Sequence, residues 1–202
     1  MTERGNQAGP VIALVTSLED PDKLGRVKVK YPWLDEKIES GWARIAAPFA
    51  GKDRGIQFIP EVGDEVLVFF QMGNFQKPVI VGSLWNGKDT PPSDVQEGKN
   101  HLKVIRTTAS HKIEFSDNKD DLYILISDGE GKNSIKLNIK DGAIEIISEK
   151  KITIKSENGE IEMKADTIVF ESKSKTEIKN GSSRMEINGS SVKINATAIN
   201  LN

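Results

Sequence analysis

The C-terminal part of the chain repeats one small pattern, and this repeat limits the possible folds more than any other feature. Pairs of apolar residues two positions apart recur in steps of seven to nine residues from Ile144 to Ile199, with charged and small polar residues between them. Each pair fits one very short strand with an apolar and a polar face, followed by a turn. The predicted core positions are Ile144, Ile146, Ile152, Ile154, Ile161, Met163, Ile168, Phe170, Ile178, Met185, Ile187, Val192, Ile194, Ile199 and Leu201.

A strand of this size cannot bury its apolar face alone, and its open edges seek partners. A parallel β-helix made by one chain needs roughly 18–25 residues per coil, so steps of about eight residues are too short for it. Three chains wound around one axis would instead supply three apolar pairs to each layer of a narrow prism. After residue 125 the only aromatic residue is Phe170, which agrees with an axis too narrow for rings. The repeat therefore predicts an obligate homotrimer with an intertwined, triple-stranded β-helix.

The first half of the chain has a different composition. All eight prolines and all three tryptophans lie before residue 93. Short apolar or alternating runs separated by turn residues predict five to six strands, and such a set in about 80 residues favours a small closed barrel of the OB type. The predicted strands are Pro10–Ser17, Arg26–Tyr31, Trp42–Ala46, Glu65–Phe70 and Pro78–Ser83.

The predicted fold class is therefore all-β, with an OB-fold barrel followed by the trimeric β-helix. A boundary is expected near Thr90–Ser93, where two prolines stiffen the chain. The predicted segments are an N-terminal arm (1–9), the OB-fold domain (10–92), a linker with the start of β-structure (93–134) and the trimeric β-helix needle (135–202).

Composition excludes several classes of protein. The 202 residues carry a net charge of −2 and contain no cysteine and only two histidines, His101 and His111, which argues against a strongly basic nucleic-acid binder, disulfides and thiol chemistry. The longest apolar runs have five residues, against the roughly 20 that a membrane-spanning helix needs. The polar N-terminus has no apolar signal region, so synthesis in the cytoplasm without a signal peptide is expected.

Three clusters were weighed as chemical sites. Arg26, Lys28 and Lys30 share one face of a predicted strand. This face could bind single-stranded nucleic acid, or it could simply be exposed to solvent, since acidic residues nearby offset its charge. The acidic residues of 117–121 lack the spacing of a calcium loop and are interpreted as a polar turn. Neither histidine lies in a nucleophile–base pattern. The sequence therefore predicts no catalytic residues and no metal ligands, and the protein is not expected to be an enzyme.

The first half also carries specific motifs, in the stretches Gly25–Asp35, Ser40–Phe70 and Gly73–Pro92. They resemble the OB-fold domain of contractile-tail spike proteins, a group with the phage baseplate assembly protein V family, the VgrG proteins of type VI secretion and the spikes of extracellular contractile injection systems. The motif residues are Gly25, Arg26, Trp42, Arg44, Pro60, Gly63, Asp64, Pro78 and Gly82.

The resemblance implies a mechanical function. In this family a trimeric spike with a triple-stranded β-helix stands at the tip of a tail tube, below a hub, and sheath contraction drives it through the envelope of the target cell. The protein would then be a structural component of a phage virion, a tailocin or a contractile injection particle. Its contact with the target membrane would be transient, and no nucleic acid is expected as a partner.

The sequence departs from the family pattern in two places. About ten residues precede the predicted barrel, so a separate hub protein of the tail or baseplate is expected. The C-terminal residues contain no His-x-His pair, so the resemblance does not extend to an apical iron site, and no cofactor is expected. A small tip protein of the PAAR type is the expected partner at the blunt C-terminal end.

Two other functions fit parts of the sequence. A trimeric glycan-binding tail or adhesin domain would share the needle, but it would need exposed aromatic residues there. An OB-fold binder of single-stranded nucleic acid would show salt-dependent binding. The net charge of −2 argues against the second function.

Overall fold

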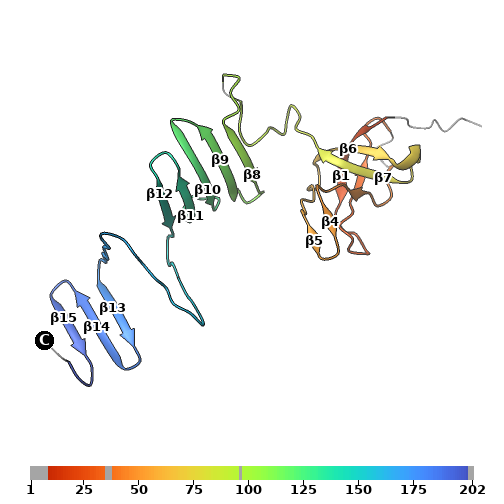
Figure 1. Ribbon diagram of the computed structural model, residues 1–202. Helices are drawn as coiled ribbons and strands as arrows, with labels where there is room; N and C mark the ends of the chain where they lie inside the picture. The colour runs from red at the N-terminus through yellow and green to blue at the C-terminus, as the bar shows by residue number, and fades with distance from the viewer. Residues whose placement is uncertain (1–8, 35–37, 96, 200–202) are drawn as a thin grey trace, which may run out of the picture. The chain divides into compact units, whose positions relative to one another are not determined.

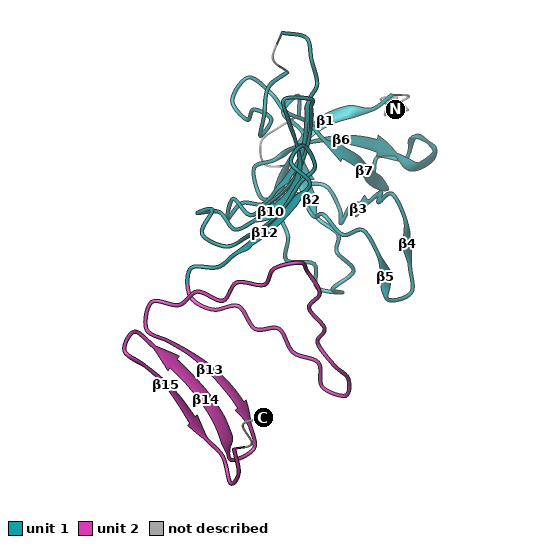
Figure 2. Cartoon of the chain, turned by 60° about the vertical axis from the view of Figure 1, so that its left-hand side comes forward, with its two compact units in different colours: residues 1–149 teal, residues 150–202 magenta. Residues whose placement is uncertain are grey.

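A computed structural model describes residues 9–34, 38–95 and 97–199 of the chain. The described residues form fifteen β-strands and a single turn of 3₁₀ helix, Gln71–Gly73, which confirms the all-β class (Figure 1). The chain divides into two compact units, residues 1–149 and 150–202 (Figure 2). Within the described ranges, no helix has the length and apolar character needed to cross a membrane. The predicted N-terminal arm lies almost wholly outside the described residues.

The first sheet is a small barrel with strand order β2-β1-β6-β7-β3. Its neighbours pair antiparallel except β3 and β7, which are parallel. Backbone hydrogen bonds between Val27 and Ala43, with N···O distances of 3.1 and 2.8 Å, join the two ends of the sheet and close it. The OB-like barrel predicted from the sequence is thus present. Its strands are β1 (Val11–Ser17), β2 (Lys28–Lys30), β3 (Arg44–Ile45), β6 (Glu65–Phe70) and β7 (Pro78–Ser83).

The barrel interior is filled by every second residue of these strands, as the alternation in the sequence requires. Tyr31 packs against Phe70 and Phe75 with ring centroids 5.9 and 5.0 Å away, and burial raises the pKa of its phenol to about 12. The buried apolar residues are Val11, Ala13, Val15, Val27, Val29, Tyr31, Ala43, Val66, Val68, Phe70 and Ile80.

A two-stranded hairpin that the sequence analysis did not predict extends from the barrel (Figure 1). It pairs β4 (Ala50–Gly51) with β5 (Arg54–Gly55), and both strands are exposed. A cleft of about 850 Å³ lies between this hairpin and the barrel wall at Ile45 and Ile80. The hairpin therefore adds a second, largely apolar surface to the domain.

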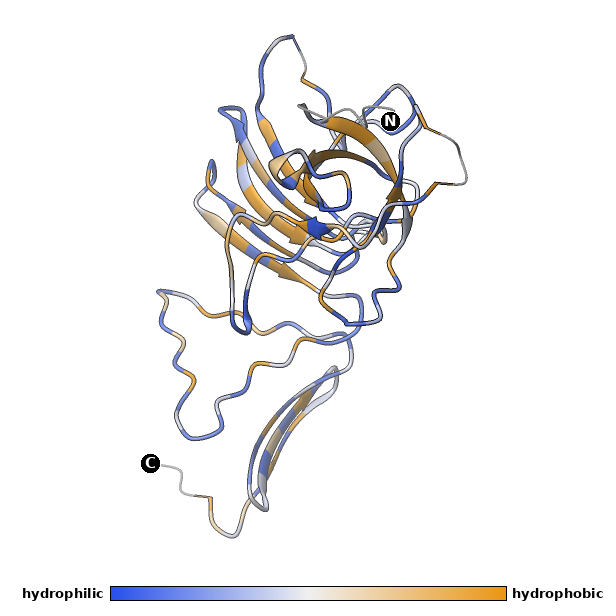
Figure 3. Ribbon diagram, turned by 90° about the vertical axis from the view of Figure 1, so that its right-hand side faces the viewer, coloured by the Kyte–Doolittle hydropathy of each residue, from blue (hydrophilic) through white to orange (hydrophobic). Residues whose placement is uncertain are grey.

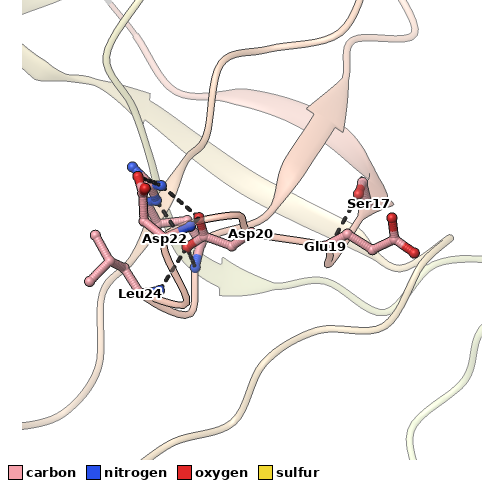
Figure 4. A network of polar contacts seen from close by, with 6 residues as sticks. Ser17, Glu19, Asp20, Asp22 and Leu24 are labelled. Carbon is pink, nitrogen blue, oxygen red and sulfur yellow. Dashed lines mark hydrogen bonds and ion pairs between the residues drawn. The ribbon is translucent and has the colours of Figure 1, made fainter.

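The turn after β1 is organised by the Asp20 carboxylate, whose side chain is only 3% exposed (Figure 4). It accepts backbone N–H bonds from Asp22, Leu24 and Arg26 at 2.9–3.2 Å and two bonds from the Arg26 guanidinium at 2.6 and 3.0 Å. The bonds from Arg26 hold the pKa of Asp20 well below its usual range. Gly25 follows at φ +69°, a left-handed conformation that favours glycine.

The second sheet is a five-stranded antiparallel meander in chain order. Consecutive strands are joined by loops of two to six residues. The boundary predicted between residues 134 and 135 falls at the start of β11, within this sheet. The strands are β8 (Leu102–Arg106), β9 (Lys112–Asn118), β10 (Asp121–Ser127), β11 (Ser134–Asn138) and β12 (Ala143–Ile147).

Residues 150–202 form a second, three-stranded meander of β13 (Lys175–Asn180), β14 (Ser183–Asn188) and β15 (Ser191–Asn195). Between β12 and β13, residues 148–174 run as an extended loop without an assigned strand, drawn mostly in magenta in Figure 2. The strands predicted there are therefore not formed in one chain. A strand needs a neighbouring strand for its backbone groups, and within the described residues no strand pairs with this segment. The described residues of one chain likewise show no triple-stranded β-helix.

Candidate functional site

The second sheet carries two complete rows of aligned side chains on one face. Strand register places one row across all five strands, and a second row lies two residues away on the same face. Nine of the ten residues are apolar, and the banding of orange and blue along these strands in Figure 3 reflects the alternation. The first row is Ile105, Ile113, Ile126, Ile135 and Ile146, and the second is Lys103, Phe115, Ile124, Leu137 and Ile144.

Most of this apolar face is left exposed by the residues that the structure describes. Ile144 and Ile146, which were predicted to lie in the core, are 72% and 54% exposed. Ile126 and Ile135, near the middle of the first row, are also exposed. A contiguous apolar surface of this extent marks an interaction site on a soluble protein.

The opposite face of the same sheet is mixed and includes ionisable groups that satisfy each other. Glu114 accepts hydrogen bonds from the Tyr123 hydroxyl and from Lys112 Nζ, the latter at 3.0 Å. Lys136 Nζ lies 4.5 Å from the centroid of the Tyr123 ring. Burial raises the pKa of Glu114, but the two hydrogen bonds and the charges of Lys112 and Lys136 together outweigh it, so the pKa lies below its ordinary value. The two faces therefore differ in kind, and only one has two predominantly apolar rows; Lys103 and its ion-pair partner Asp117 lie at one end of that face.

The three-stranded meander repeats this design with shorter rows. One row is Thr176, Ile187 and Val192, and the other is Ile178, Met185 and Ile194. The opposite face is polar at every position of the three strands. There, ion pairs to Lys179 and Lys175 at 3.1 and 3.2 Å hold the pKa of Glu177 below its ordinary value.

The loop of residues 148–174 carries three further predicted pairs. All six side chains are exposed, and every residue from 149 to 175 is exposed as well. The loop thus combines the spacing of the repeat with a stretch of backbone to which the structure assigns no strand within the described residues. The pairs are Ile152 and Ile154, Ile161 and Met163, and Ile168 and Phe170.

The structure places the predicted core residues on these surfaces but does not by itself place them on an axis. Ile199 is half-exposed after β15, and Leu201 lies outside the described residues. Sequence reasoning missed the part of the apolar face formed by β8–β10. The signal was present, because Ile113 and Phe115 are two positions apart, but the steps between pairs are less regular there.

The motif residues of the barrel mostly build turns and strand ends. Gly63 adopts φ +99° in the turn before β6, and Asp64 Oδ2 accepts the N–H of Glu61 at 2.9 Å. Pro60 and Pro78 are buried. Arg44 and Gly82 are exposed, on β3 and β7, whereas Trp42 is half-buried. The motifs therefore shape the barrel and do not converge on a reaction centre.

Two of the three basic residues weighed as a nucleic-acid surface are neutralised within the chain. Arg26 pairs with Asp20 and Asp22, each at 2.6 Å, and Lys28 pairs with Glu39 at 3.4 Å. Lys28 Nζ also lies 5.4 Å from the Trp42 ring. Across the described ranges, no group of three or more His, Cys, Asp or Glu side chains is arranged to hold a metal ion.

Comparison with known proteins agrees with the barrel and its motifs. Residues 11–85 match the family model of the type VI secretion system/phage-baseplate injector OB domain. This range begins at the first residue of β1 and ends two residues after β7. It therefore coincides with the closed barrel.

Similar curated proteins include several VgrG proteins. The actin cross-linking toxin VgrG1 of Vibrio cholerae is 32% identical over 151 residues, which are 68% of this chain and 13% of that protein. The type VI secretion system spike protein VgrG3 of Vibrio cholerae is 34% identical over 112 residues, 52% of this chain and 11% of that protein. VgrG1a of Pseudomonas aeruginosa, also a type VI secretion system spike protein, is 34% identical over 96 residues, which are 46% of this chain and 15% of that protein. The chain thus spans about an eighth of the length of these relatives.

Proposed function

Because this chain is a VgrG-like baseplate spike protein, we propose that it forms the central spike at the tip of a contractile injection tail. Three copies assemble around one axis, with the apolar rows of the second half turned inward as a triple-stranded β-helix. The spike pierces the target envelope mechanically when the tail contracts. Its role is structural and involves no catalytic step.

The observation that carries the proposal is the uncovered apolar face of β8–β12. Burying an apolar side chain of this size stabilises a protein by about 1.5–3 kcal/mol. For side chains that are half-exposed, about half of that free energy is still to be gained by further burial. When three identical faces pack together, every layer of the assembly gains this remaining free energy of burial. Equivalent residues of the three sheets then lie in the same layer around the three-fold axis.

The loop of residues 148–174 supports the intertwined form of this assembly. The structure assigns no strand to this loop, although its apolar pairs keep the spacing of the repeat. Copies of the same segment from two other chains would supply both the missing ladder and the missing core. In such an assembly the three chains are wound around each other, and pulling one chain out requires unwinding all three.

The partners follow from the position of a spike in a tail. A hub protein of the baseplate holds the trimer below the tube, and a tip protein of the PAAR type binds the far end of the needle. The polar face of β13–β15 faces water, and contact with the target membrane lasts only as long as the passage. No metal ion or cofactor takes part.

The mass of the purified protein in solution tests the proposal directly. One chain has a mass of 22.3 kDa, and three times that mass is 66.9 kDa. Light scattering after size exclusion should report the trimer, and no monomer should appear on dilution. A compact monomer at micromolar concentration would contradict the three-chain spike. As a second readout, insertion of the complete particle into liposomes should require the chain.

A further inference from the structure

Two successive turns of the three-stranded meander have the same four-residue sequence. Asn180 and Asn188 each begin a tetrapeptide Asn-Gly-Ser-Ser, and each is the last residue of its strand, β13 or β14 (Figure 2). In both turns a glycine and a serine separate the two strands, and the asparagine pairs with the second serine, Ser183 or Ser191. Any difference between the two turns therefore comes from the surrounding structure and not from these four residues.

The side chain of Asn188 is held by its own turn. Its Oδ1 accepts the backbone N–H groups of Ser190 and Ser191, each at 3.1 Å, and their hydroxyl groups at 3.1 and 3.3 Å. Bonds of this kind, from an asparagine side chain to the backbone two or three residues later, are typical of turns. The carboxamide of Asn188 is therefore fixed in one orientation.

The side chain of Asn180 lacks these bonds. It is exposed, and none of the residues that the structure describes forms a hydrogen bond with its carboxamide. Gly181 follows at φ +56°, with open space where a side chain would lie. The carboxamide of Asn180 is therefore free to turn toward the backbone nitrogen of the next residue.

Another Asn-Gly pair, after the barrel, resembles the held turn. Oδ1 of Asn86 accepts the backbone N–H groups of Lys88 and Asp89, each at 2.8 Å. Asn158 also precedes a glycine, but it lies in the loop of residues 148–174, whose pairing the proposed trimer would change. The meander therefore offers the cleanest comparison, with one free and one held asparagine in the same sequence.

An asparagine that precedes a glycine can react with its own backbone. The glycine nitrogen gives up its proton to the solvent and attacks the side-chain carbon Cγ, which forms a new N–C bond. The carboxamide nitrogen takes up a proton and leaves as ammonia, so that a five-membered succinimide ring remains. Water then opens the ring at either carbonyl and gives aspartate or isoaspartate. Nothing is oxidised or reduced, and glycine favours the attack because it has no side chain to obstruct it.

We infer that Asn180 is a site of spontaneous deamidation in the folded chain and that Asn188, in the same local sequence, is protected by its turn. Attack at Asn188 requires Cγ to rotate toward the next nitrogen, which breaks bonds to Ser190 and Ser191. Loss of two such bonds slows the reaction by at least about tenfold. The product puts a carboxylate into the β13–β14 turn and, as isoaspartate, lengthens its backbone by one CH₂ group. The inference goes beyond the proposed spike function and does not rest on it.

Trypsin separates the two sites for measurement. It cuts after Lys179, Arg184 and Lys193. The two asparagines then lie in separate peptides, residues 180–184 and 185–193, and each peptide contains a single side-chain amide. The full chain is kept folded in mildly alkaline buffer, and mass spectrometry follows the fraction of each peptide whose amide has become an acid. Residues 180–184 should convert at least about tenfold faster than residues 185–193.

The same chain unfolded in guanidinium chloride is the matched control, because it keeps the sequence and loses the hydrogen bonds of the turn. There the two peptides should convert at similar rates. Equal rates in the folded chain, faster conversion of residues 185–193 or no conversion of either peptide would overturn the inference. The same ratio of rates in the folded and the unfolded chain would also overturn it, since the difference would then come from the sequence.

A chemical control tests the assignment to Asn180. Asn180→Gln keeps an amide, but its longer side chain must close a larger ring and reacts far more slowly. Residues 180–184 of this variant should keep their mass during the incubation, while residues 185–193 should behave as in the parent chain. A mass gain in residues 180–184 of Asn180→Gln at the parent rate would show that the modification lies elsewhere and would overturn the assignment.

Discussion

The barrel and the second half of the chain are built from the same element, a short strand whose apolar residues alternate with others. In the barrel, the bonds between Val27 and Ala43 close the sheet, and the alternate residues are buried inside one chain. In β8–β12 the sheet stays open, and its two apolar rows remain half-exposed. The comparison teaches that the alternating pattern specifies a strand with one apolar face, whereas closure decides whether one chain is enough to bury it.

The difference also appears in the residues that fill the two regions. Aromatic and valine side chains fill the barrel, where a centre of limited length must be packed from several directions. Isoleucine dominates the rows of the second half, which offer a flat and regular surface. A flat apolar surface that repeats along a chain can pack against the same surface of other chains, whereas a curved sheet can close around its own core.

The largest expected effect is the loss of the trimer when the inward face is charged. Ile154→Asp would place three carboxylates around the axis. There, burial and the repulsion between the three groups both make the ionised carboxylates unfavourable. We expect no trimer by light scattering. Thr153→Asp is the matched control, because the adjacent residue points to the opposite side and should assemble normally. Normal trimer from Ile154→Asp would show that this side chain does not face the axis.

A core substitution in the barrel should have a smaller and local effect. Val29→Ala removes two methyl groups from a side chain with no exposed surface and should destabilise the barrel by about 2 kcal/mol. The mass of the trimer should not change, since the needle holds it. Differential scanning calorimetry should show an earlier first transition only. Lys30→Ala changes the next residue, which points outward, and should leave that transition in place. Loss of the trimer in Val29→Ala would contradict the proposed independence of the two regions.

The buried carboxylate of Asp20 predicts a pH dependence confined to the barrel. Its folded pKa lies below the unfolded value of about 4, so its contribution is full above pH 4 and is lost as the pH falls toward the folded value. Asp20→Asn should lower the barrel transition at pH 7 and flatten its decline between pH 4 and pH 2. Asp22→Asn, at a mostly exposed carboxylate, serves as the control. An unchanged acid profile in Asp20→Asn would rule out this assignment.

The smallest effect should come from the exposed ion pairs. Lys155 Nζ and Glu157 Oε1 are 2.7 Å apart, but both side chains are mostly exposed and salt screens them. Glu157→Gln should leave both the trimer mass and the thermal transitions unchanged at physiological salt. A clear shift would mean that the second chain of the needle covers this pair.

The sequence predicted the barrel well where strands are long and uniform. Glu65–Phe70 and Pro78–Ser83 are strands at the predicted bounds. The β4–β5 hairpin was missed because strands of two residues leave no alternation to detect. The repeat located the apolar pairs of residues 148–174, but the structure assigns no strand to them. A strand forms only with a neighbour to pair with, and the spacing of the repeat does not supply that neighbour within one chain.

The candidate site was predicted in part for the same reason. The pairs from Ile144 onward were found by their regular steps, and the structure places the first pair on a continuous apolar face. The contribution of β8–β10 became visible only through register, which aligns Ile113 with both Ile105 and Ile126. Register depends on loop lengths and cross-strand contacts that spacing alone does not report.

The short loops of the two meanders have a consequence for the order of assembly. Contacts between strands that are close in sequence form quickly, because little chain entropy is lost in closing a loop of two to six residues. Both meanders can therefore form in each chain soon after synthesis, whereas in the proposed trimer residues 148–174 would pair only after two other chains arrive. Assembly should then depend steeply on concentration, and before assembly each new chain would have both meanders formed but the segment between them still without its strands.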